Sequence, residues 1–501
     1  MKSIKFKLLS QGASGDSFFL IFVRLVTLVL GLLITRVLSG HFSLQEYGTY
    51  SQVMLLITTI SSVTILGMMD GVNFFFCKEK DETKRNSYIS TIFFLQYVVS
   101  IIVSITVLVC SVPISKYFGN DSLRPLILFA AILPVAQNTI SLLQIMFIAI
   151  GKAKLIAIRN LAISILKLVA VVLACYVFDS IAIVFLCQVI TDVFQVLYFI
   201  FVLNKNNCKI NIFKFDKSLI KEILKYCIPM AMFAVIKSLN RDSDKFVISF
   251  FTDTETLAIY TNASKLLPFD IIMTSFCTVL LPYITRYIAN KTYEKGQVVY
   301  KSFLELSYIT TTILALGAIC VAPELMRFLY TEKYTSSSFG LTVFIIYILV
   351  DIVSVLTITM ILSAAGKTKT IMLASIIPFV FNIILNIILF LGLAEIGPAL
   401  ATFIVTIVQG IVMLSLGAKE LQTNIFKMFD FKYLIYFLIE VGICFVLAYM
   451  LRNLLLSMQL HYMVVLLVVC FLFGGVLLLL NLRRLIKNLR IINSCKNSNG
   501  E

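Results

Sequence analysis

Fourteen apolar stretches of about 20 residues, separated by short polar segments, run through this chain. Each is long enough to cross the hydrocarbon core of a bilayer as one α-helix. The pattern therefore predicts an all-α polytopic membrane protein with about fourteen transmembrane helices. The predicted spans are residues 16–38, 47–74, 88–112, 125–150, 156–178, 181–203, 226–251, 257–283, 301–322, 339–362, 371–393, 396–417, 432–452 and 461–481.

The Lys and Arg residues predict the orientation of these spans. With the N-terminus placed inside, most of the 42 basic residues lie in the inner segments and few lie in the outer loops. Basic residues concentrate in the cytoplasmic loops of membrane proteins, so both termini are expected in the cytoplasm. The net charge of +16 is attributed to loops that face anionic lipid, and binding to nucleic acid is not expected.

An internal similarity at an offset of about 215 residues divides most of the chain into two halves. The sequence around Gly151 and Lys152, at the end of the fourth span, matches that around Gly366 and Lys367, at the end of the tenth. Two further pairs of short matches lie on corresponding sides of corresponding spans. The similarity predicts two six-helix repeats that enter the membrane in the same direction, followed by two extra C-terminal helices. This is an architecture of transporters.

The span pattern and the repeat together predict five segments. They are a six-helix bundle at 1–203, a cytoplasmic amphipathic linker at 204–225, a second six-helix bundle at 226–417, two additional transmembrane helices at 418–482 and a basic cytoplasmic tail at 483–501. The linker has an apolar side between lysines and is expected to lie on the inner leaflet. Because the two additional helices lie outside the repeat, we expect them to be an appendix, so a chain cut near Lys427 should still insert the first twelve spans.

Features of an enzyme are nearly absent from the sequence. The loops are too short for a catalytic domain, and the two histidines, His41 and His461, lie in predicted outer loops, so a His-based metal site is not expected. The string Gly366-Lys367-Thr368 resembles the end of a phosphate-binding loop, but Ile361 stands where that loop requires glycine. No catalytic residue, cofactor or metal site is therefore predicted.

Charged residues inside the apolar stretches are the main functional signal. A charge at mid-bilayer costs about 2.5–3.5 kcal/mol, so these side chains must face a hydrated cavity or one another. The seventh span is the densest, because Lys237, Arg241 and Lys245 follow at intervals of four residues and share one helix face. Asp244 lies three residues from Arg241, a spacing that favours pairing between the two.

Two interpretations of these charges are open. Basic side chains gather on spans 1, 7 and 8 and predict a cationic wall for an anionic substrate; the alternative is a network of ion pairs that locks span 7 to a neighbour. The residues of the predicted wall are Arg24, Lys237, Arg241 and Lys265. Asp192 and Asp351, each in the middle of a span, are candidate sites for a coupling proton or cation, or acids hydrogen-bonded to Ser or Thr of an adjacent helix.

Several strings resemble the polysaccharide-transporter branch of the multidrug/oligosaccharidyl-lipid/polysaccharide exporter superfamily, in a likeness that covers residues 16 to about 417. The strings are Glu46-Tyr47-Gly48-Thr49-Tyr50-Ser51, Asn240-Arg241-Asp242-Ser243-Asp244-Lys245-Phe246-Val247-Ile248, Ala258-Ile259-Tyr260-Thr261-Asn262-Ala263 and Gly397-Pro398-Ala399-Leu400-Ala401-Thr402. The resemblance implies a flippase that moves polyprenyl-pyrophosphate-linked oligosaccharide repeat units of O-antigen or capsule across the bacterial plasma membrane by alternating access. It also implies that the four basic residues of the predicted wall bind the pyrophosphate.

Related functions are open under the same resemblance. Fourteen spans also suit the lipid II flippases, which carry two extra helices after the repeat. A multidrug or cation antiporter of the same superfamily would need a dominant acidic site, and usually lacks those two helices. The implied partners are the lipid-linked oligosaccharide and membrane lipid, with a polysaccharide polymerase and glycosyltransferases as candidate protein partners.

Overall fold

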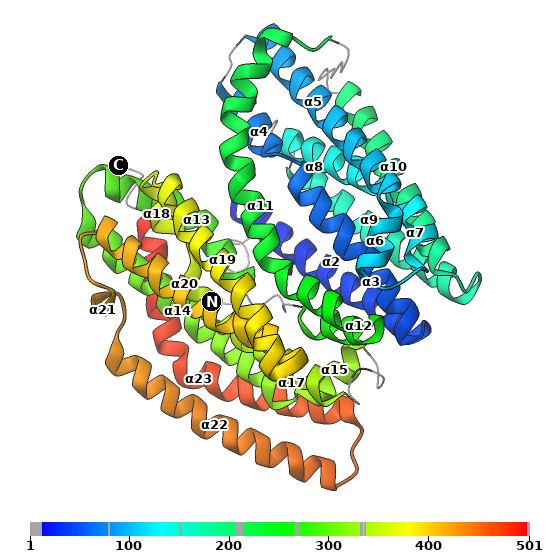
Figure 1. The fold of residues 1–501 in the computed structure, drawn as a ribbon. Coiled ribbons are helices and arrows are strands. Elements are labelled where there is room, and N and C mark those ends of the chain that lie inside the picture. Colours follow the sequence, from blue (N-terminus) through cyan, green and yellow to red (C-terminus); the bar gives the residue numbers. More distant parts are fainter. Residues whose placement is uncertain are drawn as a thin grey trace. The chain divides into compact units, whose positions relative to one another are not determined.

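The computed structural model describes residues 13–78, 81–149, 153–205, 214–265, 271–330, 334 and 337–497, and every regular element within these ranges is a helix (Figure 1). The apolar sequence explains this result, because a backbone inside hydrocarbon can satisfy its N–H and C=O groups only in a helix or a closed barrel. The predicted all-α fold is confirmed.

Ten helical stretches in the described ranges are long and apolar enough to cross a membrane. One of them, Lys369–Glu420, contains two successive helices, α19 (Thr368–Leu393) and α20 (Gly397–Glu420). The chain is therefore a multi-pass membrane protein. The number fourteen and the orientation of the spans stay predictions.

Reporter fusions test the predicted topology. Because the basic segments are expected inside, single fusions after Lys152, Lys217, Lys295 and Lys369 should report a cytoplasmic position. Fusions after Asp121, Asp253 and Glu395 should report an external one. The measurement is the activity of a reporter that works on only one side of the membrane. A reversed signal at any position after the sixth span would contradict the predicted repeat.

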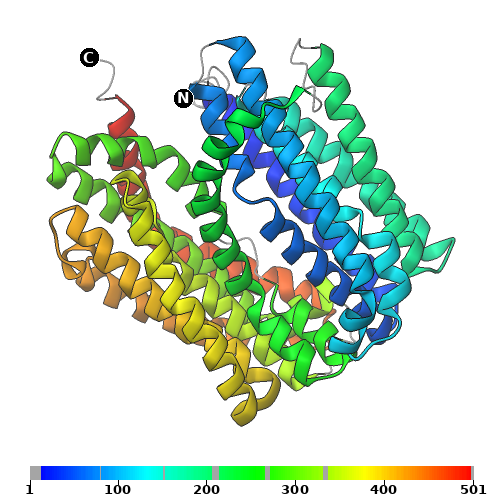
Figure 2. The ribbon, with the colours of Figure 1, turned by 45° about the horizontal axis from the view of Figure 1, so that its top comes forward.

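The first of two compact units comprises Met1–Asp242 and Ser249–Ala258. Its apolar core joins residues of five helices with the start of α11 (Ile220–Phe251). Those five are α4, α5, α8, α9 and α10, and α2 packs along α9 (Figures 1 and 2). The helices of this unit are α2 (Ala13–His41), α3 (Leu44–Thr64), α4 (Met68–Lys78), α5 (Glu82–Val109), α6 (Ser111–Tyr117), α7 (Leu123–Ala130), α8 (Leu133–Ala149), α9 (Ala153–Tyr176) and α10 (Ile181–Lys205).

The predicted second span is two helices rather than one. Helix α3 ends at Thr64 and α4 begins at Met68, and between them Leu66 (φ 45°) and Gly67 (φ 65°) adopt left-handed backbone conformations. The carbonyl of Thr64 accepts a hydrogen bond of 3.1 Å from Nε2 of the buried Gln96. The break therefore occurs where a neighbouring side chain replaces a lost helical hydrogen bond.

The predicted linker is described only in part, since residues 206–213 lie outside the described ranges. After them, Phe215 stacks on Phe94 of α5 with ring centroids 3.9 Å apart. The backbone N–H of Asp216 donates a hydrogen bond of 2.9 Å to Oγ1 of Thr91, also on α5. The end of the linker therefore packs against α5, and α11 begins soon afterwards at Ile220.

The second compact unit comprises Ser243–Ile248 and Ile259–Glu501. The boundary between the units, as grouped by contacts, therefore runs through α11 and α12 (Thr254–Ala263). The further helices of this unit are α13 (Ile271–Ala289), α14 (Tyr293–Cys320), α15 (Ala322–Tyr330), α17 (Ser338–Ser354), α18 (Met360–Ala364), α19, α20, α21 (Ile425–Met428), α22 (Phe431–Ser457) and α23 (Tyr462–Asn497).

Helices α22 and α23 belong to the core of this unit. Phe437 of α22 and Phe473 of α23 are buried in one apolar cluster with Phe303 and Ile309 of α14. Helix α23 packs extensively along α14 (Figure 1). The expectation that these two helices form an appendix is therefore wrong: lying outside a sequence repeat does not prevent a helix from completing the same core.

Charged side chains also fasten the two C-terminal helices to this core. Arg452 of α22 donates from Nε (2.9 Å) and Nη2 (2.7 Å) to the two carboxylate oxygens of the buried Glu324 on α15. Arg484 of α23 donates from Nε to Glu305 of α14 (2.7 Å) and from Nη2 to Asp430 (2.6 Å). We call these contacts the α22–α23 clamp.

A close helix contact in the first unit gives a sharp test of its packing. A Cβ atom added at Gly48 of α3 would lie 2.2 Å from the backbone oxygen of Thr254, whereas one added at Gly31 of α2 meets nothing within 4 Å. Overpacking costs about 1–3 kcal/mol or more, while Gly→Ala in an open helix position gains up to about 1 kcal/mol. Gly48→Ala should lower the melting temperature of the solubilised protein and Gly31→Ala should not; equal melting temperatures would contradict the contact.

Candidate functional site

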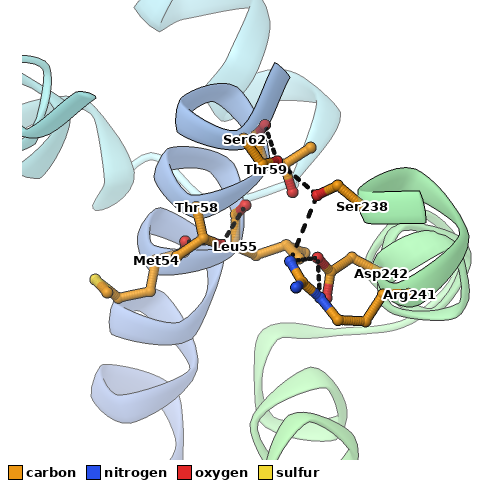
Figure 3. A network of polar contacts seen from close by, with 8 residues as sticks. All are labelled: Met54, Leu55, Thr58, Thr59, Ser62, Ser238, Arg241 and Asp242. Carbon is orange, nitrogen blue, oxygen red and sulfur yellow. Dashed lines mark hydrogen bonds and ion pairs between the residues drawn. The ribbon is translucent and has the colours of Figure 1, made fainter. Parts of the chain in front are cut away.

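Arg241 is the predicted wall residue whose surroundings the structure describes most fully (Figure 3). It lies on α11, and its guanidinium donates to Oδ2 of Asp242 from Nε (3.2 Å) and from Nη2 (3.0 Å). Nη2 also donates to Oγ of Ser238 at 3.4 Å. Oγ of Ser238 lies 2.5 Å from Oγ of Ser62, on α3.

The hydroxyl protons fix the direction of this chain of hydrogen bonds. A serine hydroxyl has one proton to donate. Ser62 donates it to the backbone oxygen of Thr59 at 2.8 Å. Ser238 must then donate to Ser62, and it accepts from Arg241 on its other side. The guanidinium is therefore tied to the backbone of α3 through two serines, as Figure 3 shows.

The orientation of Arg241 leaves part of its guanidinium available. Its side chain is 57% exposed, although its partner Asp242 is only 6% exposed. The contacts given by the described part of the chain use Nε and Nη2, so Nη1 is presented to the surroundings. A half-paired, oriented arginine on an apolar helix is suited to bind an anion with several oxygen atoms.

The expected pairing of Arg241 with Asp244 is wrong. Asp244 is 1% exposed and accepts a hydrogen bond of 2.9 Å from the hydroxyl of Tyr260, and another from that of Tyr347. Tyr260 lies on α12 and Tyr347 on α17. Helical spacing alone brings Asp244 within reach of Arg241, but two phenol groups from other helices hold the carboxylate instead.

The other predicted wall residues are described unequally. The side chains of Arg24 on α2 and Lys237 on α11 lie outside the described residues, so their contacts stay predictions. Lys265 is exposed just after the end of α12 and belongs to the second unit, whereas Arg241 belongs to the first. That these four residues form one cationic wall therefore stays a prediction.

Asp192 lies in a network of charged and amide side chains between α9 and α10. Its Oδ1 is 2.9 Å from Nζ of Lys167 and accepts a hydrogen bond of 2.9 Å from Nε2 of Gln195. Oε1 of Gln195 in turn accepts from Nη1 of Arg159. The partners of Asp192 are therefore a lysine and an amide, and not the Ser or Thr side chains considered from the sequence.

Sequence reasoning overlooked Arg159. It is 6% exposed, and its guanidinium carbon lies 4.4 Å from the ring centroid of Phe199. Arg159 lies three residues after the start of the predicted span at 156, so the sequence alone does not distinguish it from a basic residue of the adjacent loop. The i to i+4 spacing of Gln195 and Phe199 on α10 was the available signal, because both side chains contact Arg159.

Asp351, the second candidate coupling residue, is 4% exposed on α17. In the same unit, Asn382 and Asn386 of α19 each donate an amide hydrogen bond of 3.2 Å to Oγ of Ser243. Within the described ranges, no three His, Cys, Asp or Glu residues are grouped as a metal site requires. Two amide groups of α19 therefore converge on the hydroxyl of Ser243.

Solved structures with the same fold are membrane transporters and flippases. A lipid II flippase MurJ in an inward closed conformation has a TM-score of 0.73 and 18% identity, covering 94% of this chain and all of that one. An inward-facing multidrug resistance MATE family transporter of the MOP superfamily has a TM-score of 0.63 and 14% identity, covering 80% of this chain and 98% of the other. A MOP superfamily transporter from Pyrococcus furiosus has a TM-score of 0.56 and 14% identity, covering 81% of this chain and 94% of the other.

Sequence comparison gives the family. No curated protein sequence matches this chain significantly. A family model described as "polysaccharide biosynthesis protein" matches residues 34–339, which is more than half of the chain and includes α3 and α11, the helices that carry Arg241 and its hydrogen-bond partners. The chain therefore belongs to this polysaccharide biosynthesis protein family.

Proposed function

We propose that this protein is a flippase that translocates polyprenyl-pyrophosphate-linked oligosaccharide repeat units across the bacterial plasma membrane. The cell-surface polysaccharide supplied in this way is O-antigen or capsule. Both termini are cytoplasmic in this proposal, and the protein works by alternating access. A polysaccharide polymerase and glycosyltransferases are its proposed partners in the cell.

The observation that carries the proposal is the exposed guanidinium of Arg241 on an apolar helix of a family member. A cation facing lipid would cost about 2.5–3.5 kcal/mol, so its exposure indicates a hydrated space. Asp242 and Ser238 orient the side chain without enclosing it. A pyrophosphate matches this donor, because its oxygens accept several N–H groups at once. Arg24, Lys237 and Lys265 are proposed to contribute to the same anion site.

Asp192 and Asp351 stay the proposed sites for a coupling ion. Asp192 is the more constrained of the two, because it must release Lys167 in order to take up a proton or cation. Exchange between this lysine and an incoming proton is the proposed chemical basis for coupling, since both compensate the same buried carboxylate.

Two other functions are favoured by particular observations. The likeness to the MurJ structure extends over all of that chain, including its C-terminal part, and favours transport of a lipid-linked cell-wall precursor. The likeness to a multidrug resistance MATE transporter favours the alternative of a multidrug or cation antiporter. An exposed arginine suits an anionic substrate and argues against the second of these.

Three strains separate these functions. We expect the protein to restore surface polysaccharide in a strain that lacks its own repeat-unit flippase. We expect no rescue of a strain depleted of its lipid II flippase and no increase in drug resistance of a strain without efflux pumps. Surface polysaccharide is measured by immunoblot beside the membrane abundance of the protein. Rescue of only the second or third strain would reject the proposal in favour of the matching alternative.

A further inference from the structure

The break between α3 and α4 places irregular backbone inside a predicted span. Leu66 and Gly67 have left-handed conformations there, and Gln96 binds the freed carbonyl of Thr64. Non-helical backbone at membrane depth is tolerated where it is buried in protein or lines a hydrated cavity. Half-helices of this kind commonly border the substrate sites of transporters.

Asp70 lies in the first turn of α4, directly after the break. Asp70 is exposed, and within the described part of the chain its carboxylate makes no ion pair or hydrogen bond. Asp70 lies four residues before the inner end of the predicted span at 74, so the exposed side of α4 is expected to reach water there. The N-terminus of α4 favours the negative charge at this position.

An aromatic surface adjoins this carboxylate. Phe74 follows Asp70 by four residues on the same helix face, and its ring stacks on Tyr226 of α11 with centroids 4.3 Å apart and planes 16° apart. Phe74 is 36% exposed. Asp70 is close enough to Tyr226 to interact with it electrostatically. The carboxylate and the stacked rings therefore border the same hydrated space.

A close approach of the two helices makes this surface rigid. A Cβ atom added at Gly71 would lie 2.6 Å from Sγ of Cys227, so α4 and α11 pack closely at this point. Gly71 lies between Asp70 and Phe74, and Cys227 follows Tyr226. The carboxylate and the stacked rings are therefore carried by two helices that pack against each other.

We propose that Asp70, Phe74 and Tyr226 form a sugar-binding subsite for the oligosaccharide of the transported lipid, an inference that rests on the proposed function. The carboxylate accepts hydrogen bonds from neighbouring sugar hydroxyls, and the aromatic surface packs against the C–H face of the ring. Because Asp70 repels anions, the bound sugar carries no acidic group. Tyr226 and Arg241 are about 22 Å apart along α11, so one extended molecule can occupy both sites.

Binding to two lipids tests this subsite. The probes are undecaprenyl pyrophosphate and the same lipid carrying a neutral disaccharide, measured with the purified full-length protein in lipid nanodiscs. We expect the wild type to bind the disaccharide lipid more tightly. Asp70→Ala and Phe74→Leu should weaken that binding by about tenfold and leave the sugar-free lipid unaffected. Asp70→Glu should recover part of the loss.

Matched variants and the sugar-free lipid separate the possible outcomes. Asp121→Asn removes a charge in a predicted outer loop and Phe129→Leu removes an exposed ring of α7, so both should bind like the wild type. The proposed subsite would be contradicted if Asp70→Ala and Phe74→Leu bound the disaccharide lipid like the wild type. It would also be contradicted if both variants lost affinity for the two lipids equally. A wild type that binds the two lipids equally would contradict it as well, although the proposed function would then stand. A wild type that binds neither lipid would reject both.

Discussion

Replacing Arg241 by alanine should abolish export while the protein stays in the membrane. The exposed guanidinium is the proposed pyrophosphate donor, and losing charged hydrogen bonds to it should weaken substrate binding by about tenfold or more. Arg241→Lys should keep part of the activity, because lysine supplies the charge without the planar donor pair. The same results are expected for Arg24→Ala and Lys237→Ala. Surface polysaccharide in the flippase-deficient strain is measured beside membrane abundance.

A double variant distinguishes binding from a structural ion pair. If the pair is only structural, Arg241→Ala should lower abundance, because the buried Asp242 loses this cation. Arg241→Ala with Asp242→Asn removes both charges. If the pair is only structural, the double variant should regain both abundance and export. Normal abundance without export is the result expected of a substrate-binding arginine.

A matched control guards against a general effect of lost positive charge. Arg286 is exposed near the end of α13, in a predicted inner segment, and has no proposed contact with the substrate. Arg286→Ala should therefore export like the wild type. Full export in Arg241→Ala, or the same partial loss in both variants, would contradict the role of Arg241.

The helices could largely be predicted because hydrocarbon permits few backbone structures. The stretch predicted at 181–203 appears as α10, Ile181–Lys205, since apolar residues continue to both ends. The break at Leu66 and Gly67 could not be predicted in this way. Glycine is common within transmembrane helices, so Gly67 alone does not predict a break. The hydrogen bond from Gln96 to the carbonyl of Thr64 compensates a lost helical hydrogen bond, and this tertiary contact cannot be read from the sequence.

The candidate site was predictable in its residue types but not in its pairing. The exposed position of Arg241 follows from the cost of a charge in lipid, which the sequence already implies. Its partner does not, because Asp242 and Asp244 are both within reach on a helix. The choice depends on Tyr260 and Tyr347, which come from helices distant in the sequence and hold Asp244. Sequence spacing contains no information on that contact.

The α22–α23 clamp is the feature that changes the expected effect of truncation. Ending the chain after Lys427 removes Arg452 and Arg484 and leaves the buried Glu324 and Glu305 without these partners. It also uncovers the apolar face of α14. At pH 7 the truncated protein should therefore be degraded.

Single and double substitutions at Glu324 and Arg452 separate the charge from the rest of the helix. Glu324→Leu or Arg452→Met leaves one buried charge unpaired and should cost about 3–5 kcal/mol, seen as low abundance and an early melting transition. The double variant buries two apolar side chains and should recover most of that loss. The Lys367–Glu420 pair is a suitable control, since it is 3.7 Å long with a half-exposed lysine, so Glu420→Gln should change little. A double variant as unstable as the sum of the singles would show that the two charges do not act as a pair.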